Sequence, residues 1–282
     1  LSTVLLTGRL DVAQTMDSPS KLTAATLDQW MDDLSNWGRW GKEDELGTLN
    51  LITPKERRQA AALVTGGISV SLAFDLAKEA NVNNEYPLEH SLRVHENDGG
   101  VFAEDTYTIR YHGLVHSHVD ALCHIFHRGK MYNGFWRSEV KPSGAEKLGV
   151  QHMKQGIFTR GVLVDVPWLK GVPYLEPGTA VRVEDLEEWE RRTGIKVASG
   201  DVLLVRTGLY KRQGEVGTWN FAQHASGLHA SVVTWLKERD VAVIGSDGTN
   251  EVFPSGIEGV PFPIHQLAVV ALGMPLLDNL NL

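Results

Sequence analysis

Residues with the chemistry to bind a metal gather in one short stretch of the sequence. Five of the 11 histidines lie between His112 and His127, in YHGLVHSHVDALCHIFH, together with an aspartate. Imidazole and carboxylate groups are the usual ligands of catalytic divalent metals such as Mn²⁺ and Zn²⁺. Because alternate side chains of an extended strand share a face, a strand here would point His116, His118 and Asp120 in one direction. The spacing therefore predicts a three-ligand site with a coordination position left open.

A helical backbone would instead align His116, Asp120 and His124 on one face. Gly113 and two β-branched valines favour a strand that ends near Asp120, in a turn that brings His124 towards the same site. An imidazole with an ordinary pKa near working pH is suited to general base catalysis, which is the role we expect for His124. The alternative role of His124 is that of ligand to a second metal.

The single cysteine, Cys123, limits the alternatives. Structural zinc sites are mostly rich in thiolate ligands, so a purely structural zinc site is disfavoured. A thiol nucleophile is also disfavoured, because sequence neighbours such as Cys123 and His124 generally point apart, and we expect a buried, inert thiol. One cysteine excludes an internal disulfide and indicates a reducing compartment.

The composition is that of a water-soluble globular protein, with 282 residues of which 42% are hydrophobic and 22% charged. A net charge of −8 offers no basic surface for nucleic acid or anionic lipid. The N-terminal apolar run is too short for a signal peptide, and no segment has the ~18 apolar residues of a membrane span. We therefore expect a cytoplasmic protein that binds a small molecule. It should have an N-terminal arm over residues 1–20 and a single domain over residues 21–282.

Turn and periodicity signals predict a mixed α/β fold. The sequence TPKE at Thr53 is typical of a capping box that opens a helix, and Gly66 and Gly67 should end that helix. Other predicted helices cover residues 183–192, 231–238 and 264–272. Predicted strands cover residues 68–74, 107–112, 161–166, 202–206 and 241–245.

Three further sets of residues are candidates for the site. Asp247 follows a predicted strand and either orients a ligand histidine or caps a turn. His229 either lines the site or lies partly buried near the start of a helix. Four aromatic residues lie in segments expected to flank the site and suit a flat carbonyl compound, although each could equally pack the core or a subunit contact: Trp37, Trp40, Phe126 and Trp136.

The stretch GLVHSHVDALCH resembles the metal-binding signature of the cyclase-like metal-dependent hydrolases, the family of bacterial kynurenine formamidase and isatin hydrolase. The usual form of that signature is His-Thr-Gly-Thr-His-x-Asp-x-Pro-x-His. Its second histidine, aspartate and last histidine correspond to His118, Asp120 and His124. Its first histidine falls on Leu114 and its glycine on His116. His116 would then supply the missing ligand from two residues further along the same strand face.

Other segments extend the resemblance from about residue 37 to residue 282. They are WGRWGKEDELGTLNLITP at 37–54, YNG at 132–134, VIGSDGTNEVFP at 243–254, and PIHQL followed by GMPLLDNLNL. In the last of these, His265 and Asp278 correspond to the family's ligands for a second metal. The resemblance implies a swivelling β/β/α-type fold and assembly as a homodimer or homotetramer.

The resemblance also implies a reaction. A divalent metal, Mn²⁺ or Zn²⁺, would activate water to open an amide, cyclic imide or lactone bond of a small, aromatic carbonyl compound. Two alternatives come from other classes of protein. One is a lyase or cyclase that acts through an enolate, and the other is a non-catalytic protein that binds a small molecule with the help of a metal.

Overall fold

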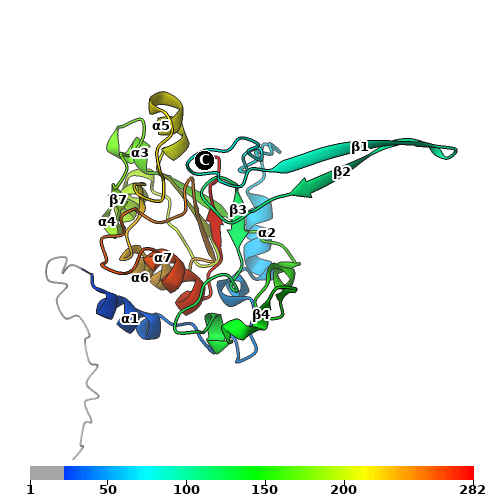
Figure 1. Cartoon of the computed structure of the whole chain (residues 1–282). Helices are drawn as coiled ribbons and strands as arrows, with labels where there is room; N and C mark the ends of the chain where they lie inside the picture. Colours follow the sequence, from blue (N-terminus) through cyan, green and yellow to red (C-terminus); the bar gives the residue numbers. More distant parts are fainter. Residues whose placement is uncertain (1–21) are drawn as a thin grey trace, which may run out of the picture.

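A five-stranded sheet forms the centre of the fold in the computed structural model, which describes residues 22–282 (Figure 1). The strand order is β3 (His118–Asp120), β11 (Leu276–Asp278), β10 (Val243–Ser246), β8 (Val202–Arg206) and β6 (Gly161–Asp165). Strands β11, β10, β8 and β6 are parallel, and β3 is antiparallel to β11 at one edge. The α/β class predicted from the sequence is confirmed. The arm predicted over residues 1–20 lies outside the described residues.

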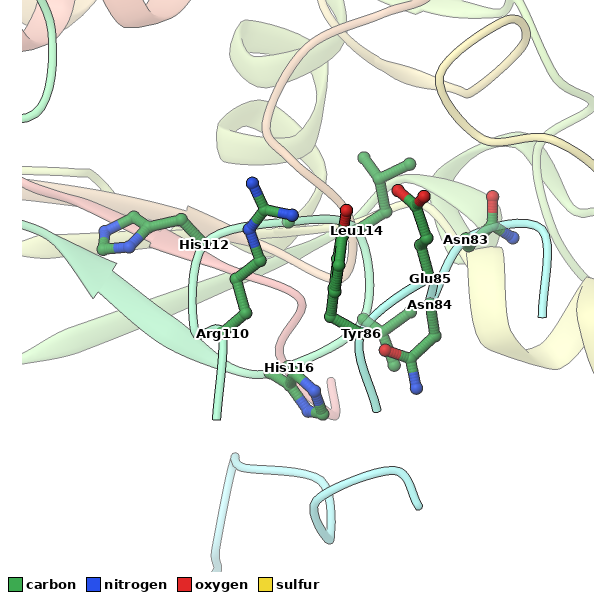
Figure 2. A pocket seen from close by; sticks show the side chains of 10 residues that line it. Asn83, Asn84, Glu85, Tyr86, Arg110, His112, Leu114 and His116 are labelled. Atoms are coloured by element: carbon green, nitrogen blue, oxygen red, sulfur yellow. The ribbon is translucent and has the colours of Figure 1, made fainter. Parts of the chain in front are cut away.

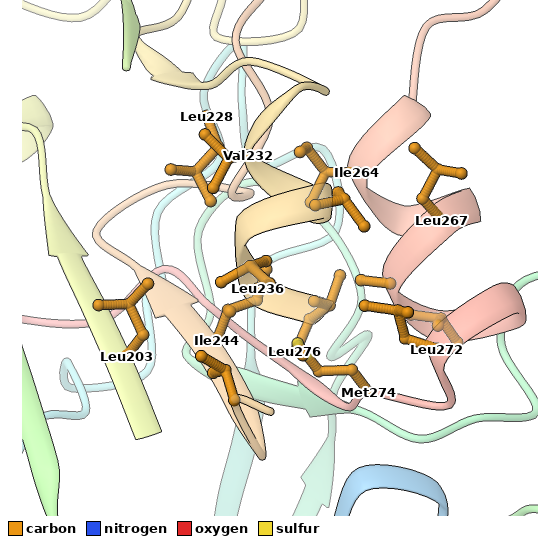
Figure 3. Close-up of a cluster of buried hydrophobic side chains, with 14 of the residues drawn as sticks. Leu203, Leu228, Val232, Leu236, Ile244, Ile264, Leu267, Leu272, Met274 and Leu276 are labelled. Atoms are coloured by element: carbon orange, nitrogen blue, oxygen red, sulfur yellow. The ribbon is translucent and has the colours of Figure 1, made fainter. Parts of the chain in front are cut away.

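The inner strands of the sheet are buried, as expected for parallel strands of almost continuous apolar sequence. On one face, Leu203 and Ile244 belong to the main core together with α6 (Val232–Glu238) and the π-helical segment η5 (Gln266–Leu272), as Figure 3 shows. Every residue from Leu267 to Leu272 is at most 1% exposed. A helix that is apolar all round must be buried, and η5 fills this position in the core.

The remaining helices are short and surround this core. They are α1 (Ala24–Asp33), α2 (Pro54–Ala62), α3 (Val166–Lys170), α4 (Val183–Thr193), α5 (Leu209–Val216) and α7 (Pro263–His265), which leads directly into η5. The capping box predicted at the start of α2 is present, with the side chain of Glu56 accepting from the main-chain N–H of Thr53 at 3.1 Å. All four predicted helices are confirmed, with ends displaced by at most a few residues. In the part of the chain from residue 22 onwards, none of the helices has the length and apolar character needed to cross a membrane.

Small elements complete the loops between these helices and strands. They are the paired strands β4 (Val140–Lys141) and β5 (Gly144–Ala145), the paired strands β7 (Ala180–Val181) and β9 (Gly227–Leu228), and the 3₁₀ helices η1 (Gly47–Leu51), η2 (Tyr132–Gly134), η3 (Arg137–Glu139) and η4 (Val150–Met153).

A long β-hairpin made of β1 (Glu89–Asn97) and β2 (Gly100–Thr108) projects away from the rest of the chain (Figure 1). The strand predicted over residues 107–112 is therefore largely wrong, because the pairing of β2 ends at Thr108, opposite Glu89. The strand predicted over residues 68–74 is also wrong, since that segment has no regular secondary structure. The other three predicted strands are confirmed as β6, β8 and β10.

Candidate metal centre

The edge of the central sheet brings together residues that are far apart in the sequence. In the antiparallel pairing of β3 and β11, His118 lies opposite Asp278 and Asp120 lies opposite Leu276. The loop before β3 is also tied to the residue after β11. The Asn279 side chain donates hydrogen bonds to the main-chain oxygens of residues 113 and 116, at 2.9 and 3.2 Å. This pairing places the side-chain carboxylate of Asp278 beside the histidine-rich stretch.

His112, His118 and Asp120 form a first group with the spacing of metal ligands. One side-chain ligand atom of each residue lies within 4.8 Å of the other two. The Nε2 atoms of His112 and His118 lie 3.1 and 3.4 Å from Asp120 Oδ1. Asp120 Oδ1 is buried and has no well-directed hydrogen bond from the described residues. An acceptor left in this way requires a partner, and a divalent cation between the two imidazoles and the carboxylate fits that need.

Asp120 also belongs to a second group, with His265 and Asp278, in which the ligand atoms again lie within 4.8 Å of one another. His265 Nε2 lies 3.5 Å from Asp120 Oδ2 and 3.5 Å from Asp278 Oδ2. All three residues are buried. The two groups meet at Asp120, which turns one oxygen towards each. The two carboxylates and one imidazole of the second group also fit a divalent metal.

Hydrogen bonds donated by Nδ1 orient the imidazole rings of His118 and His265. His118 donates from Nδ1 to the main-chain oxygen of His116 at 2.8 Å. His265 donates from Nδ1 to Glu251 Oε1 at 3.1 Å. In both rings Nε2 is then directed at the carboxylates. A metal-binding histidine usually has such an acceptor at its other ring nitrogen.

A buried amide supports the second carboxylate. Asn250 donates from its side chain to Asp278 Oδ1 at 2.6 Å and to the main-chain oxygen of Leu277 at 3.1 Å. The other oxygen of Asp278, Oδ2, remains directed at His265. Asn250 therefore fixes which oxygen of Asp278 faces the second group.

The charges within the cluster set its protonation states. Burial by itself would raise the pKa of Asp120, but the nearby imidazoles of His112 and His118 and the charge of His265 hold it far below its ordinary value. Burial by itself would lower the pKa of His265, but the carboxylates of Asp278 and Glu251 raise it to about 10. A metal that binds His265 must therefore displace a proton.

His116, predicted to be a ligand, belongs to neither group. The predicted strand from residue 116 is shorter than expected, because β3 begins only at His118. The rings of His112 and His116 are clearly apart in Figure 2. His116 is 4% exposed, and neither ring nitrogen has a hydrogen-bond partner among the described residues. In the structure, His112 occupies the place in the first group that the spacing predicted for His116.

His124 lies beside the first group. Its ring packs on the ring of His112, with a centroid distance of 3.9 Å and an angle of 31° between the planes. The predicted turn after Asp120 is present, because the main-chain N–H of His124 donates to the oxygen of Ala121 at 3.1 Å. Partial burial and the neighbouring His112 lower the pKa of His124. The neutral imidazole can accept a proton next to the ligand group.

A pocket of about 210 Å³ adjoins the first group (Figure 2). Residues 83–86, Arg110 and residues 112–116 line it, so His112 belongs both to the pocket and to the ligand group. The guanidinium carbon of Arg110 lies 4.2 Å from the ring centroid of Tyr86. A small molecule in this pocket would lie next to His112.

Asp247 and His229 lie outside both ligand groups. The carboxylate of Asp247 accepts hydrogen bonds of 2.7 to 3.1 Å from the main-chain N–H groups of residues 207–209, and one of 2.9 Å from the Thr207 hydroxyl. Asp247, which directly follows β10, thereby holds the turn between β8 and α5. His229 precedes α6, and its Nδ1 lies 2.9 Å from the hydroxyl of Ser231.

The four aromatic residues predicted to contact a substrate do not line the pocket beside the first group. Trp40 packs on an arginine, with 4.7 Å between the guanidinium carbon and the ring centroid. The ammonium group of Lys130 lies 5.9 Å from the ring centroid of Trp37 and 5.2 Å from that of Trp136. Phe126 is 40% exposed.

Three residues of the cluster were not identified from the sequence: His112, Asn250 and Glu251. His112 lies in the histidine-rich stretch, but Gly113 and the irregular loop after it separate His112 from β3, so no strand periodicity relates it to His118. The segment VIGSDGTNEVFP carried a family resemblance, but nothing in it distinguished Asn250 or Glu251 from Asp247. The sequence signal for Glu251 is an acidic residue directly before the apolar residues Val252 and Phe253.

The comparisons with known proteins agree with this fold. A crystal structure described as that of a novel cyclase has a TM-score of 0.78 and 27% sequence identity, covering 89% of this chain and 86% of that one. Isatin hydrolase bound to the product analogue thioisatinate has a TM-score of 0.53 at 19% identity, covering 79% of this chain and 83% of that one. Isatin hydrolase A from Ralstonia solanacearum has a TM-score of 0.53 at 20% identity with the same coverage. The cyclase-like fold implied by the sequence is thus confirmed.

No curated protein matches the chain significantly. The model of the Cyclase family, described as "Putative cyclase", matches residues 57–250, which is more than half of the chain. The chain therefore belongs to this cyclase family.

Proposed function

We propose that this protein is a metal-dependent hydrolase that opens an amide, cyclic imide or lactone bond of a small carbonyl compound. The observation that supports this most directly is the position of Asp120, which contributes one oxygen to each of two imidazole and carboxylate groups. Donors of this kind bind Mn²⁺ or Zn²⁺, and three protein ligands leave room for water. Membership of the cyclase family is consistent with this assignment.

The first metal would be held by His112, His118 and Asp120, and a second by Asp120, His265 and Asp278. A divalent metal bound in this way lowers the pKa of a coordinated water and polarises a carbonyl oxygen. The residues of the chain supply the rest of the chemistry: they fix the ligands, hold the substrate and move protons.

His124 is the proposed general base and acid. Its ring lies against His112, which also lines the pocket, so a proton taken from water can be passed to the leaving group on the same side. General base catalysis by a positioned imidazole contributes about 10² to 10⁴ in rate. His124 stands outside both ligand groups, so its loss should affect rate without removing a ligand.

The pocket favours a small substrate. Its volume of about 210 Å³ is below the usual range for drug-sized ligands. The Tyr86 ring and the Leu114 side chain offer apolar surface, and Arg110 offers hydrogen-bond donors for a carbonyl or an anion. These residues are consistent with the flat carbonyl compound expected from the sequence. The fold shared with isatin hydrolases makes isatin a first compound to test.

The test is turnover across a panel of aryl amides, cyclic imides including isatin, and aryl lactones. We expect chelation to abolish activity, and Mn²⁺ or Zn²⁺ to restore it. The product should be heavier than the substrate by one water. Asp120→Asn should abolish both metal binding and turnover, because both ligand groups lose a charged oxygen. Asp98→Asn, at an exposed position, is the matched control and should change neither.

Two outcomes would reject the proposal in favour of its alternatives. A metal-dependent product of unchanged composition, or one that has lost a fragment without gaining water, would identify a lyase or cyclase. Tight binding of panel compounds by the metal-loaded protein, with no conversion of any of them, would identify a binding protein.

A further inference from the structure

Two pockets share the same arginine. The pocket of about 210 Å³ beside the first group and a further pocket of about 530 Å³ are both lined by Glu85, Tyr86 and Arg110. We call the first the inner pocket, because its lining includes the ligand His112, and the other the outer pocket. The outer pocket lies at the base of the hairpin, since the first residue of β1 and the last residue of β2 also line it. Arg110 therefore lies at the boundary between the two pockets.

An aromatic ring holds the guanidinium group of Arg110. Its carbon lies 4.2 Å from the ring centroid of Tyr86, and Figure 2 shows the two side chains next to each other. Such a contact uses the charge of the guanidinium group and none of its five N–H donors. Within residues 22–282, the guanidinium group has neither a carboxylate at ion-pair distance nor an acceptor for a hydrogen bond. Its donors are therefore available to a molecule in the pocket.

The inner pocket is the less negative of the two. Among the described residues that line either pocket, Arg110 is the one arginine or lysine. In the outer pocket it stands with the carboxylates of Glu85 and Glu89. In the inner pocket it stands with Glu85 alone, and His112 and His116 contribute imidazole rings. An anion at Arg110 is therefore repelled less on the side of the inner pocket.

The carboxylate of Glu85 leaves the guanidinium group free. The two groups are clearly apart in Figure 2, where the side chain of Tyr86 lies between them and His112 lies beyond Arg110. Arg110 precedes His112 by two residues, so their Cα atoms are at most about 7 Å apart. A small molecule can therefore contact His112 and the guanidinium group at the same time.

We propose that Arg110 is a specificity-determining residue that binds a carboxylate carried by the substrate. A planar carboxylate accepts paired hydrogen bonds from a guanidinium group, and the ring of Tyr86 beside it offers a surface for an aromatic ring. The substrate class then narrows from small carbonyl compounds to anionic ones, such as aryl cyclic imides with a carboxylate substituent. The reaction in this statement rests on the proposed function, whereas the binding of a carboxylate at Arg110 does not.

Isothermal titration of the protein with two matched compounds tests the binding without any reaction. The probes are carboxyphthalimide and phthalimide, which differ in one carboxylate. Chelator and low salt are used, because a bound metal would itself attract a carboxylate and salt would screen the charge of the arginine. The wild type should bind carboxyphthalimide at least about 10-fold more tightly than phthalimide, the effect of hydrogen bonds to a charged group.

Variants of Arg110 identify the group that binds the carboxylate. Arg110→Gln should lose the preference for carboxyphthalimide, and Arg110→Lys should keep part of it, because lysine retains the charge without the paired donors. Arg93→Gln makes the same change at an exposed position of β1 and should keep the full preference. Circular dichroism and metal content would show that each variant is folded with its centre intact.

Two binding results would overturn the proposal. One is equal affinity of the wild type for the two compounds, which would mean that the pocket does not recognise the carboxylate. The other is a preference that persists in Arg110→Gln, because another group would then bind the anion.

Turnover by the metal-loaded protein separates this proposal from the proposed function. Arg110→Gln should lower kcat/KM for carboxyphthalimide at least about 10-fold more than for phthalimide, mainly through KM. Equal losses for the two compounds would place Arg110 at the reacting group and overturn its role in specificity. If neither compound is converted but the binding preference is present, the proposed function fails and the carboxylate site stands.

Discussion

Glu251 holds His265 through two hydrogen bonds to one carboxylate oxygen. Oε1 accepts from the main-chain N–H of His265 at 2.9 Å and from its Nδ1 at 3.1 Å. Glu251 is 1% exposed, and burial raises its pKa against the opposing effect of His265. The contact keeps Nδ1 on the Glu251 side and leaves Nε2 facing Asp120 and Asp278, so Nε2 is the nitrogen that can bind a metal once its proton is displaced.

Glu251→Gln should therefore weaken metal binding without removing a ligand. The amide oxygen can still accept from His265 but carries no negative charge, and weakening an orienting partner in this way typically lowers metal affinity by about 10- to 100-fold. Isothermal titration with Zn²⁺ or Mn²⁺ would measure the change. Glu258→Gln, seven residues away and exposed, should bind metal like the wild type. Equal affinity in Glu251→Gln and the wild type would show that His265 needs no carboxylate partner.

Substitution of His112 and of His116 distinguishes the ligand set proposed from the structure from the one predicted by spacing. His112→Ala should lower the metal content of the purified protein, because the first group loses one of its three donors. His116→Ala should keep the metal, because the part of His116 that supports His118 is its main-chain oxygen. Elemental analysis of both variants, prepared in parallel, checks this. The reverse pattern would restore the ligand set first expected from the sequence.

His124→Ala should keep its metal and lose rate. We expect kcat to fall by about 10² to 10⁴, the usual contribution of a general base. His127→Ala, at a histidine whose Nε2 lies 3.3 Å from Asp28, is a control with the same change of side chain. Full activity in His124→Ala would exclude His124 from proton transfer, and loss of metal would instead make it a ligand.

The stability of the metal-free protein should fall as pH rises from about 6.5 to about 10. The pKa of His265 is raised to about 10 in the folded protein from an ordinary value of 6.5, so the folded state keeps a proton that the unfolded state releases. This stabilisation is complete below the lower value and is lost as pH passes the higher one. One pKa unit corresponds to about 1.4 kcal/mol, so the loss is on the order of a few kcal/mol.

Urea unfolding with chelator present, at intervals across this pH range, measures that loss. His265→Asn should have a flatter dependence, because it lacks the group that titrates. Parallel curves for the two proteins would show that another group is responsible.

Asp247→Asn should reduce stability and leave metal binding intact. The carboxylate accepts from three main-chain N–H groups and one hydroxyl, and an amide oxygen can replace only part of this set. The expected loss in the free energy of unfolding is about 1 to 3 kcal/mol. Denaturant unfolding and metal titration of the same preparation test both halves of the prediction. Loss of metal at unchanged stability would place Asp247 in the metal centre after all.

The sequence predicts the elements of the sheet better than their arrangement. Residues 161–166 and 202–206 read as strands because apolar β-branched residues are bounded by glycines and charges, and both are strands in the structure. The pairing of Asp278 with His118 depends on contacts between segments about 160 residues apart in the sequence, which no local pattern specifies. Only the family resemblance pointed to Asp278.

The ligand set shows the same limit on a smaller scale. His118 and Asp120 keep the strand spacing on which the prediction relied, because β3 covers both. His116 lies in the irregular loop before β3, where its main-chain oxygen accepts a hydrogen bond from the Asn279 side chain. A loop fixed by a distant residue has no periodicity, so the choice between His112 and His116 requires the three-dimensional structure.

The division of Asp120 between the two groups has a consequence for how the centre fills. Its Oδ1 faces His112 and His118, and its Oδ2 faces His265. A carboxylate is a rigid plane, so turning it to suit one cation turns its other oxygen at the same time. Binding of a metal at one position would therefore change the affinity at the other, so the two positions would not fill independently.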